Sequence, residues 1–270
     1  MKTIVITGSS SGIGKATAKH FAAQGWQVAA TMRKPENETE LNQIDNISLY
    51  QLDVTDQASI DSAAAQILSD YETVDVVLNN AGYGLMGPFE ATSAEKIRRQ
   101  FDTNVFGLME VTRAFIPHFR ANKAGLFMNV SSIGGLITFP LISLYHSSKW
   151  AVEGFSESLA FELRELGIQV KLIEPGGVST DFGGRSMDIA MPSELPDYMP
   201  MVQAVMAGWQ KRSGGGSTAE QMAAYIFDAA TDGKQQMRYV LGDDAKQLYA
   251  MRKQVGDDAF MVGMRQQMLG

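Results

Sequence analysis

The feature that most constrains this 270-residue chain is a regular alternation of short apolar segments with segments of helical periodicity. Several apolar segments are hydrophobic throughout, which is typical of strands buried on both faces of a parallel sheet. Helices that connect parallel strands cross over in the right-handed sense and cover both faces. The sequence therefore predicts an α/β fold with a doubly wound parallel sheet in three αβα layers. The seven expected strands are Thr3–Thr7, Gln27–Thr31, Ser48–Leu52, Val74–Leu78, Gly125–Val130, Gln169–Ile173 and Arg238–Leu241.

Capping signals mark the start of two of the intervening helices. Thr92 followed by Glu95 has the spacing of a capping box, in which the two side chains satisfy free backbone N–H groups at a helix start. Thr218 followed by Gln221 has the same spacing. We expect a helix to begin after each threonine.

One stretch interrupts the alternation. Residues 182–216 contain three prolines, a Gly-Gly pair and a glycine run, with no clear strand. Long irregular insertions in compact domains are often binding loops or lids, and the five methionines and Trp209 in this one favour burial against apolar groups. We therefore expect a single domain over residues 1–270, with residues 182–216 as a substrate-binding loop or lid.

Composition excludes several classes of function. The chain has no cysteine, which rules out disulfides, thiolate nucleophiles and iron–sulfur clusters. Its 23 basic and 30 acidic residues give a net charge of −7 without a basic run, which argues against nucleic acid as a partner. Histidine and carboxylate residues show no metal-ligand spacing, so we expect no metal. The first apolar segment is too short for a signal peptide, and we expect a cytoplasmic protein.

A second uncharged stretch is long enough to raise the question of a membrane span. Residues 124–148 contain no Asp, Glu, Lys or Arg. Polar residues, two glycines and a proline interrupt the stretch, which favours a buried strand followed by an uncharged loop that lines a pocket. We expect no membrane span.

A glycine-rich turn follows the first expected strand, and a helical pattern begins at once. Glycines at this point allow close backbone approach and direct free N–H groups at the phosphates of a ligand. The spacing is G-x-x-x-G-x-G, and a purely structural tight turn is the alternative interpretation. The segment comprises Gly8, Ser10, Ser11, Gly12, Ile13 and Gly14, together with Ser9.

Five motifs in order make the comparison with a known family specific. They are TGSSSGIG at residues 7–14, NNAG at 79–82, a serine pair at 131–132, YHSSK at 145–149 and PGGVST at 175–180. With these motifs the chain resembles the short-chain dehydrogenase/reductase family over about residues 2–181. The resemblance implies a Rossmann-type fold with a seven-stranded sheet, a nicotinamide cofactor and oxidoreductase activity.

The resemblance implies four catalytic residues. Tyr145 corresponds to the general acid/base, and Lys149 to its cationic partner, which also binds the nicotinamide ribose. A free tyrosine titrates near ~10, so a phenolate near neutral pH needs a shift of roughly three units, about 4 kcal/mol. Lys149 lies one helical turn away and can supply part of it. Ser132 corresponds to the substrate-orienting serine, and Asn104 to the asparagine that holds a water in the proton path.

The remaining motif residues correspond to cofactor contacts, although Asn79 and Asn80 can equally brace the end of a strand. Asp53 and Val54 correspond to the pair at the adenine, and the PGGVST segment to the nicotinamide side. The expected cofactor-binding residues are Gly8, Ser10, Ser11, Gly12, Ile13, Gly14, Arg33, Asp53, Val54, Asn80, Ala81, Gly82, Tyr145, Lys149, Pro175, Gly176, Val178 and Thr180.

The end of the second strand bears on the choice between NADP and NAD. NAD-binding proteins place an acidic residue there for the ribose hydroxyls, whereas NADP-binding proteins offer an arginine to the 2′-phosphate. This chain has AATMRK at residues 29–34, which places Thr31 at the acid position and Arg33 just beyond it. We expect NADP, with NAD as the alternative cofactor.

The sequence thus predicts an NADP(H)-dependent oxidoreductase that interconverts a carbonyl and an alcohol of a hydrophobic small molecule. The expected apolar pocket floor consists of Leu136, Phe139, Leu141 and Leu144. A non-catalytic nicotinamide-binding regulatory protein is the alternative from another class, and a sugar-nucleotide epimerase is a second enzymatic one. A regulator does not need Ser132 and Tyr145, so their presence favours the enzyme.

The resemblance also implies an oligomer. Family members commonly pair the helix that carries the asparagine and the helix that follows the tyrosine across dimer axes. We therefore expect a homodimer or homotetramer. The apolar residues that could form its interface are Phe115, Phe119, Phe155, Leu159 and Phe161, although packing within the chain explains them as well.

Overall fold

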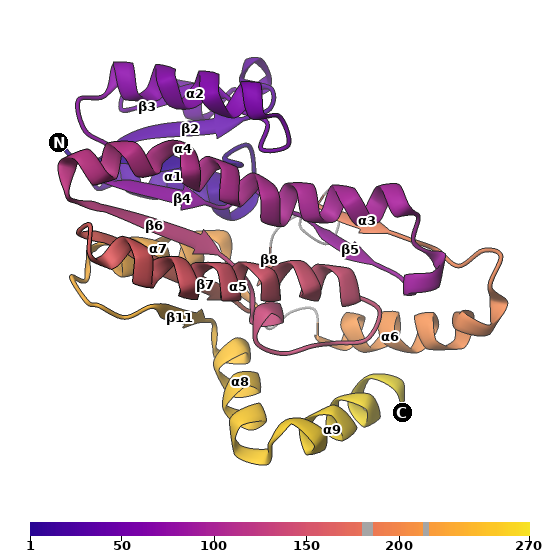
Figure 1. Ribbon diagram of the computed structural model, residues 1–270. Helices are drawn as coiled ribbons and strands as arrows, with labels where there is room; N and C mark the ends of the chain where they lie inside the picture. Colours follow the sequence, from indigo (N-terminus) through magenta and orange to yellow (C-terminus); the bar gives the residue numbers. More distant parts are fainter. Residues whose placement is uncertain (180–185, 213–215) are drawn as a thin grey trace.

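A seven-stranded parallel sheet forms the centre of the computed structural model (Figure 1). The structure describes residues 1–179, 186–212 and 216–270, without the side chains of 210–212. The strand order β11-β7-β6-β4-β1-β2-β3, with parallel neighbours throughout, confirms the predicted doubly wound sheet. The strands are β1 (Thr3–Ile6), β2 (Gln27–Met32), β3 (Ile47–Gln51), β4 (Val76–Asn79), β6 (Gly125–Val130), β7 (Ile168–Pro175) and β11 (Arg238–Leu241).

Helices cover the two faces of the sheet and bury a separate hydrophobic core on each. One core includes Phe21 and Ile226 from α1 and α7, and the other includes Ile60, Phe115 and Leu159 from α2, α4 and α5. Two-sided burial explains why these strands are apolar throughout. The longer helices are α1 (Gly12–Ala23), α2 (Gln57–Asp70), α3 (Ala94–Phe101), α4 (Gly107–Asn122), α5 (Ser143–Arg164), α6 (Met199–Arg212), α7 (Ala219–Thr231), α8 (Asp243–Val255) and α9 (Asp257–Leu269).

The capping predictions have different outcomes. Thr218 caps α7 in the predicted capping box with Gln221. The prediction for α3 is wrong by one residue, because Ser93 is the cap and accepts a hydrogen bond from the backbone N–H of Lys96 at 3.3 Å. The Thr92 hydroxyl instead donates to the carbonyl of Pro88 at 3.0 Å. A π-helical turn, η4 (Asp102–Phe106), joins α3 to α4.

The insertion is more regular than the sequence predicts. It contains β9 (Met187–Ile189), which pairs in parallel with β5 (Gly84–Met86), and the helix α6, which packs against α9. The prediction of burial holds for part of its apolar side chains. Met187, Met201 and Trp209 pack on a third core, whereas Met191 and Met206 are exposed. This third core also includes Ile137, Leu141, Val205, Phe260, Met264 and Met268.

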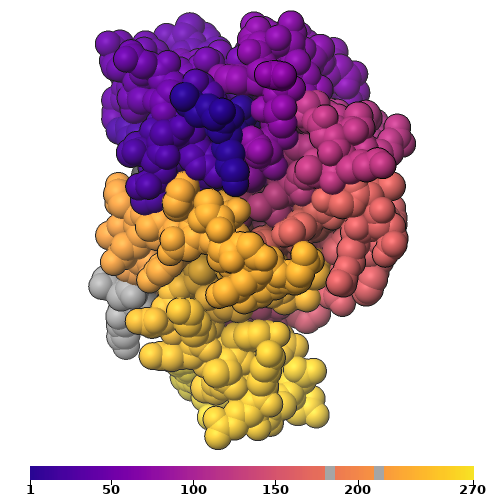
Figure 2. All heavy atoms as spheres, turned by 90° about the vertical axis from the view of Figure 1, so that its left-hand side faces the viewer, coloured from indigo at the N-terminus to yellow at the C-terminus, as the bar shows by residue number. Residues whose placement is uncertain are grey.

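The C-terminal helices α8 and α9 form a lobe that projects from the body of the molecule (Figure 2). Short elements complete the described chain. These are the helical turns η1 (Pro35–Asn37), η2 (Leu41–Gln43), η3 (Phe89–Ala91), η5 (Ile133–Gly135) and η7 (Pro196–Tyr198), and the strand pair β8 (Val178–Ser179) and β10 (Ser217–Thr218).

The uncharged stretch at residues 124–148 forms β6, the loop that contains η5, and the start of α5. Within the part of the chain that the structure describes, no helix combines the length and the apolarity needed to cross a bilayer.

Candidate active site

A single cleft of about 1340 Å³ runs along the ends of the parallel strands, where ligands bind in doubly wound sheets. Gly14 and Asn104 pack behind its lining, and Thr180 lies outside the described residues. The other residues that the sequence predicts for the site line this cleft together. They are Gly8, Ser10, Ser11, Gly12, Ile13, Arg33, Asp53, Val54, Asn80, Ala81, Gly82, Ser132, Tyr145, Lys149, Pro175, Gly176 and Val178.

The glycine-rich turn has a shape that other residues would not permit. Gly8 and Gly12 have φ angles of 70° and 54°, a region that favours glycine. A Cβ on Gly14 would collide with the carbonyl oxygen of Gly8. The first turn of α1 contains no acidic residue, and the structure shows no side-chain cap from Ser11. The N–H groups at this helix start can therefore receive a phosphate.

Thr7 and Asn80 fasten the turn to the sheet. The Thr7 hydroxyl oxygen accepts hydrogen bonds from the backbone N–H groups of Asn80 and Ala81, at 2.9 and 3.0 Å. The Asn80 side chain donates to the carbonyl of Thr7 at 2.9 Å. Asn79 instead braces the sheet interior. This role of Thr7 was not predicted. A polar residue at the end of an apolar strand was the signal in the sequence that could have indicated it.

The end of β2 differs from the prediction in one respect. The Thr31 side chain is fully buried, and Met32 and Arg33 are the residues that line the cleft. The residue at the end of β2 that lines the cleft is therefore Met32, which is also not acidic. At the end of β3, the Asp53 carboxylate accepts hydrogen bonds from the Thr55 backbone N–H and hydroxyl, at 2.9 and 2.7 Å.

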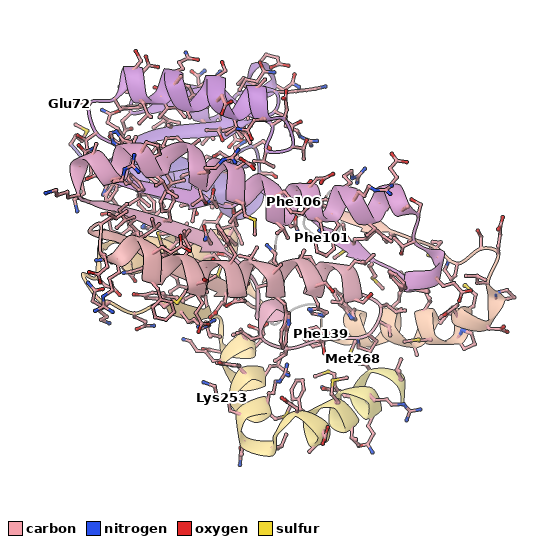
Figure 3. The ribbon with its side chains drawn as sticks, in the orientation of Figure 1. Glu72, Phe101, Phe106, Phe139, Lys253 and Met268 are labelled. Carbon is pink, nitrogen blue, oxygen red and sulfur yellow. The ribbon has the colours of Figure 1, made fainter. Side chains whose placement is uncertain are left out.

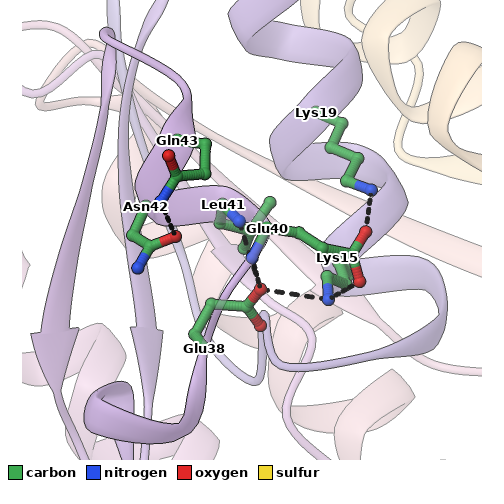
Figure 4. Close-up of polar contacts among 7 residues, drawn as sticks. All are labelled: Lys15, Lys19, Glu38, Glu40, Leu41, Asn42 and Gln43. Carbon is green, nitrogen blue, oxygen red and sulfur yellow. Dashed lines mark hydrogen bonds and ion pairs between the residues drawn. The ribbon is translucent and has the colours of Figure 1, made fainter.

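The loop after β2 is held against α1 by ion pairs (Figure 4). Lys15 lies 3.0 Å from Glu38 and 2.6 Å from Glu40, and Lys19 lies 2.5 Å from Glu40. These contacts engage Glu38 and Glu40 of the loop. Arg33 is exposed and, among the described residues, has no ion-pair partner. Its guanidinium is therefore available to an anion.

Ser132, Tyr145 and Lys149 gather at the other end of the cleft. Ser132 follows β6, and the other two lie on the first two turns of α5. The Ser132 hydroxyl oxygen accepts a hydrogen bond from the Gly134 N–H at 3.0 Å and is hydrogen-bonded to Tyr145. Lys149 Nζ donates to the Val130 carbonyl at 2.9 Å and lies 5.7 Å from the centre of the Tyr145 ring.

Burial dominates the titration of this group. Burial raises the pKa of Tyr145 above its ordinary value, and the hydrogen bond with Ser132 opposes this. Burial also lowers the pKa of Lys149 to about 8, against the opposing charge of Glu153. The prediction was that the charge of Lys149 lowers the pKa of Tyr145. In the structure the Lys149 ammonium lies over the Tyr145 ring and donates to the Val130 carbonyl. Tyr145 is therefore protonated in this state.

Asn104 lies in the π-helical turn η4, next to the catalytic residues. Its side-chain N–H groups donate to the Tyr83 carbonyl at 2.9 Å and the Ser148 hydroxyl at 3.1 Å, and its oxygen accepts from the Tyr83 N–H at 3.0 Å. A polar side chain inside a helix often bonds to a backbone carbonyl of its own helix. The Asn104 side chain bonds instead to Tyr83 and Ser148, which lie outside its helical turn. A Cβ on Gly82 would lie 3.2 Å from Asn104 Oδ1 and 3.7 Å from Lys149 Nζ, so one glycine separates the two side chains.

The substrate end of the cleft is only partly as predicted. Of the four expected floor residues, Phe139 lines the cleft; Leu136 and Leu141 pack into the third core, and Leu144 is not in the lining. Figure 3 shows Phe139 and Met268 near the C-terminal lobe. The observed apolar lining comprises Ile133, Phe139, Ile142, Met187, Trp209, Leu248 and Met268.

The cleft mouth also carries charges that the sequence analysis missed. Asp188 of β9 lies 2.6 Å from Lys96 and 3.1 Å from Arg99 on α3. Arg99 also donates to the Tyr83 hydroxyl at 3.2 Å. No local pattern could reveal these contacts, because their partners lie about ninety residues apart in the sequence.

Comparisons with known proteins agree with this geometry. A family model described as short chain dehydrogenase matches residues 2–188. An uncharacterized oxidoreductase of Schizosaccharomyces pombe is 38% identical over 88% of this chain and 99% of its own length. A 3-ketodihydrosphingosine reductase of Bacteroides thetaiotaomicron is 33% identical over 93% of this chain and 91% of its own.

Solved structures are similar as well. A short-chain dehydrogenase from Streptomyces avermitilis is 34% identical and superposes with a TM-score of 0.85, over 98% of this chain and 97% of its own. ElxO with NADP bound is 26% identical, with a TM-score of 0.72 over 88% of this chain and 97% of its own. On the family model and these identities, the chain belongs to the short-chain dehydrogenase/reductase family of oxidoreductases.

Proposed function

We propose that this protein is an NADP(H)-dependent oxidoreductase that interconverts a carbonyl and an alcohol on a hydrophobic small molecule, with Tyr145 as the general acid/base. One observation carries the proposal. A single cleft joins the glycine-rich turn and Arg33 at one end to Ser132, Tyr145 and Lys149 at the other. A nucleotide cofactor and a carbonyl substrate can therefore meet in one site.

The residues present fit a nicotinamide dinucleotide. The N–H groups at the start of α1 suit the pyrophosphate, because the first helical turn has no acidic residue and Ser11 makes no side-chain cap there. Pro175, Gly176 and Val178 line the cleft near the catalytic end and suit the nicotinamide. The hydride for the carbonyl carbon would come from the nicotinamide ring of the bound cofactor.

The catalytic side chains have complementary tasks. Ser132 orients the carbonyl oxygen, and Tyr145 donates its phenolic proton to that oxygen as negative charge develops there. The Lys149 ammonium stabilises the phenolate that remains. Burial keeps Tyr145 protonated before the reaction, which favours the reductive direction. Asn104, behind the cleft next to Lys149, would hold a water in the proton path to that lysine.

Arg33 supports NADP as the cofactor. It lines the cleft, it is exposed, and Met32 beside it brings no negative charge that would repel a 2′-phosphate. One relative of solved structure, ElxO, was determined with NADP. The same site geometry would admit NAD with weaker selection.

The lining supports a hydrophobic substrate. Aromatic, branched and methionine side chains from four separate segments face the catalytic end, and soft methionine side chains adapt to irregular apolar ligands. The relative named for the reduction of 3-ketodihydrosphingosine acts on a ketone, in agreement with this class. We therefore propose aliphatic or aromatic ketones and aldehydes as substrates.

The Tyr145→Phe variant tests the proposal. It removes the transferable proton and keeps the ring, so we expect NADPH-dependent reduction of hydrophobic ketones to fall by at least about 100-fold. Binding of NADPH, followed by fluorescence, should change little because the cofactor cleft is intact. Reduction at an unaltered rate would contradict the assignment. Loss of both binding and turnover would show only that the fold had failed, which circular dichroism detects.

A further inference from the structure

Two glutamates lie beneath the catalytic residues, and the proposed reaction does not use them. Glu153 is on α5, one turn beyond Lys149, and Glu174 is in β7, directly before Pro175. Their side chains are 7% and 0% exposed. Arg238 of β11 approaches both, with Nη2 3.2 Å from Glu153 Oε2 and Nε 3.4 Å from Glu174 Oε1.

The charges around the two glutamates do not balance two ionised carboxylates. Arg238 also lies 2.8 Å from the exposed carboxylate of Glu157, so three acidic groups share it. Lys149 from α5 and Lys253 from α8 act on the pair through their charge alone. Two adjacent buried carboxylates strongly disfavour double ionisation.

The hydrogen bonding leads to the same conclusion. The Glu153 and Glu174 carboxyl groups face each other, and the Ser131 hydroxyl faces Glu153. Ser131 and Arg238 are the donors that approach Glu153, but among the described residues none reaches strict hydrogen-bonding geometry with any of the four carboxylate oxygens. Ionised carboxylates only accept hydrogen bonds, whereas a protonated carboxyl donates one. A proton between the two groups would supply the missing donor.

We propose that Glu153 and Glu174 share a single proton and act as positioning residues, holding one negative charge beneath Lys149 and joining the Ser131–Ser132 segment to the Glu174–Pro175 segment. The effect of the pair on Lys149 and on the Ser132 loop rests on the proposed function; the shared proton does not. Both joined segments line the cleft, and α5 carries Tyr145 and Lys149 above the pair.

The packing shows how the pair can position the catalytic loop. A Cβ on Gly135 in η5 would lie 2.5 Å from Ser131 Oγ and 2.9 Å from Glu153 Oε1. The loop that carries Ser132 therefore packs directly on Glu153. A shift in the Glu153 carboxyl, which Glu174 faces, would move this loop.

The charges show how the pair can influence Lys149. Burial and the Glu153 carboxylate raise the pKa of Glu174, against the charge of Arg238, so Glu174 holds the proton. The remaining charge on Glu153 raises the pKa of Lys149 and opposes the effect of burial. Without that charge, Lys149 would lose its proton at lower pH.

Infrared spectroscopy of the resting protein tests the shared proton without any turnover. We expect the carbonyl band of a buried protonated carboxyl at about pH 7, far above the ordinary pKa of glutamate. Glu174→Gln should remove the band, because Glu153 is the partner that is already ionised. Absence of the band from the unaltered protein, or its persistence in Glu174→Gln, would overturn the shared proton.

The pH profile of ketone reduction tests the effect on Lys149. We expect Glu153→Gln to move the alkaline limb of kcat to lower pH by about half a unit to one unit, because it removes the charge nearest Lys149. Glu174→Gln leaves that charge in place, so the limb should stay while kcat falls by about threefold. Glu162→Gln, which removes an exposed carboxylate from the same helix, is the matched control and should leave the profile unchanged.

The outcomes separate this inference from the proposed function. An unmoved alkaline limb in Glu153→Gln, with thermal unfolding showing an intact fold, would overturn the positioning role. A protein that reduces no carbonyl compound would instead refute the proposed function, and the infrared result would stand independently of it.

Discussion

Arg33 is a single residue on which cofactor choice can turn. A charge-assisted hydrogen bond to a 2′-phosphate contributes about 1.5 to 3 kcal/mol, so Arg33→Ala should raise KM for NADPH by about ten- to a hundredfold. KM for NADH should hardly change, because NADH has no phosphate at that position. Steady-state kinetics with both cofactors measure the difference, with Lys34→Ala as a matched control on the same loop. An equal change for both cofactors would contradict the assignment.

Residue-scale prediction from the sequence works where spacing alone places a side chain. The four-residue spacing of Tyr145 and Lys149 is sufficient, because one turn of α5 brings them to the same side of the helix. Prediction fails at Thr31, which was expected to face the cofactor. The side chain of Thr31 is buried and the next residue, Met32, lines the cleft, because successive residues of a strand point to opposite faces. Prediction also fails for Asp188, whose partners on α3 come close only through tertiary packing.

The short helical turn η5 supports the loop that carries Ser132, and its packing can be tested at Gly135. Gly135 has no room for a Cβ beside Ser131 and Glu153. We expect Gly135→Ala to lower the free energy of unfolding by about 1 to 3 kcal/mol, as overpacking does, and to reduce kcat by displacing the loop of Ser132. Denaturant unfolding and steady-state kinetics measure both effects.

A second glycine provides the matched control for that experiment. Gly263 lies within α9, and a Cβ there would meet nothing within 4 Å. Because alanine is the better helix former, Gly263→Ala should raise the free energy of unfolding by about 0.5 to 1 kcal/mol. If Gly135→Ala and Gly263→Ala had the same free energy of unfolding, the crowding around Gly135 would have no energetic consequence. The catalytic loop would then not be tightly packed.

The elements themselves were predictable to different degrees. The strands were predictable because burial on both faces leaves a continuous apolar run. The helix α6 was missed because its three methionines and one proline give no clean periodicity, and its packing partner α9 is distant in the sequence. The π-helical turn η4 was also missed, since one extra residue in a helical turn leaves little trace in the pattern.

At the scale of the whole molecule, the C-terminal lobe completes the site. Leu248 and Met268 from α8 and α9 line the cleft, so the candidate site includes residues far beyond the last sequence motif. Arg252 holds the lobe in place: it donates to the Leu136 carbonyl at 2.7 Å and pairs with Asp257 at 2.9 Å. The sequence alone could not predict that the lobe contacts the catalytic loop, because Arg252 and Leu136 are more than a hundred residues apart.

The surface of α5 bears on oligomer formation. Of the five apolar residues expected at an interface, Phe115, Phe119 and Leu159 are buried within the chain, and Phe161 is exposed. Trp150 is exposed as well, and a spacing of eleven residues places it on the same side of α5 as Phe161. Phe161, one of the residues that the sequence suggested, and Trp150 therefore give α5 exposed apolar surface that is available for a dimer.

We predict that the protein forms a dimer or tetramer through this side of α5. Phe161→Glu places a charge where Phe161 is 76% exposed, so it should not disturb the core. An interface there would have to bury that charge, which costs several kcal/mol and should convert the oligomer into monomers. Analytical ultracentrifugation measures the change, with Phe89→Glu on the exposed turn η3 as the control. An oligomer that persists in Phe161→Glu would place the interface elsewhere, and a monomeric unaltered protein would refute assembly altogether.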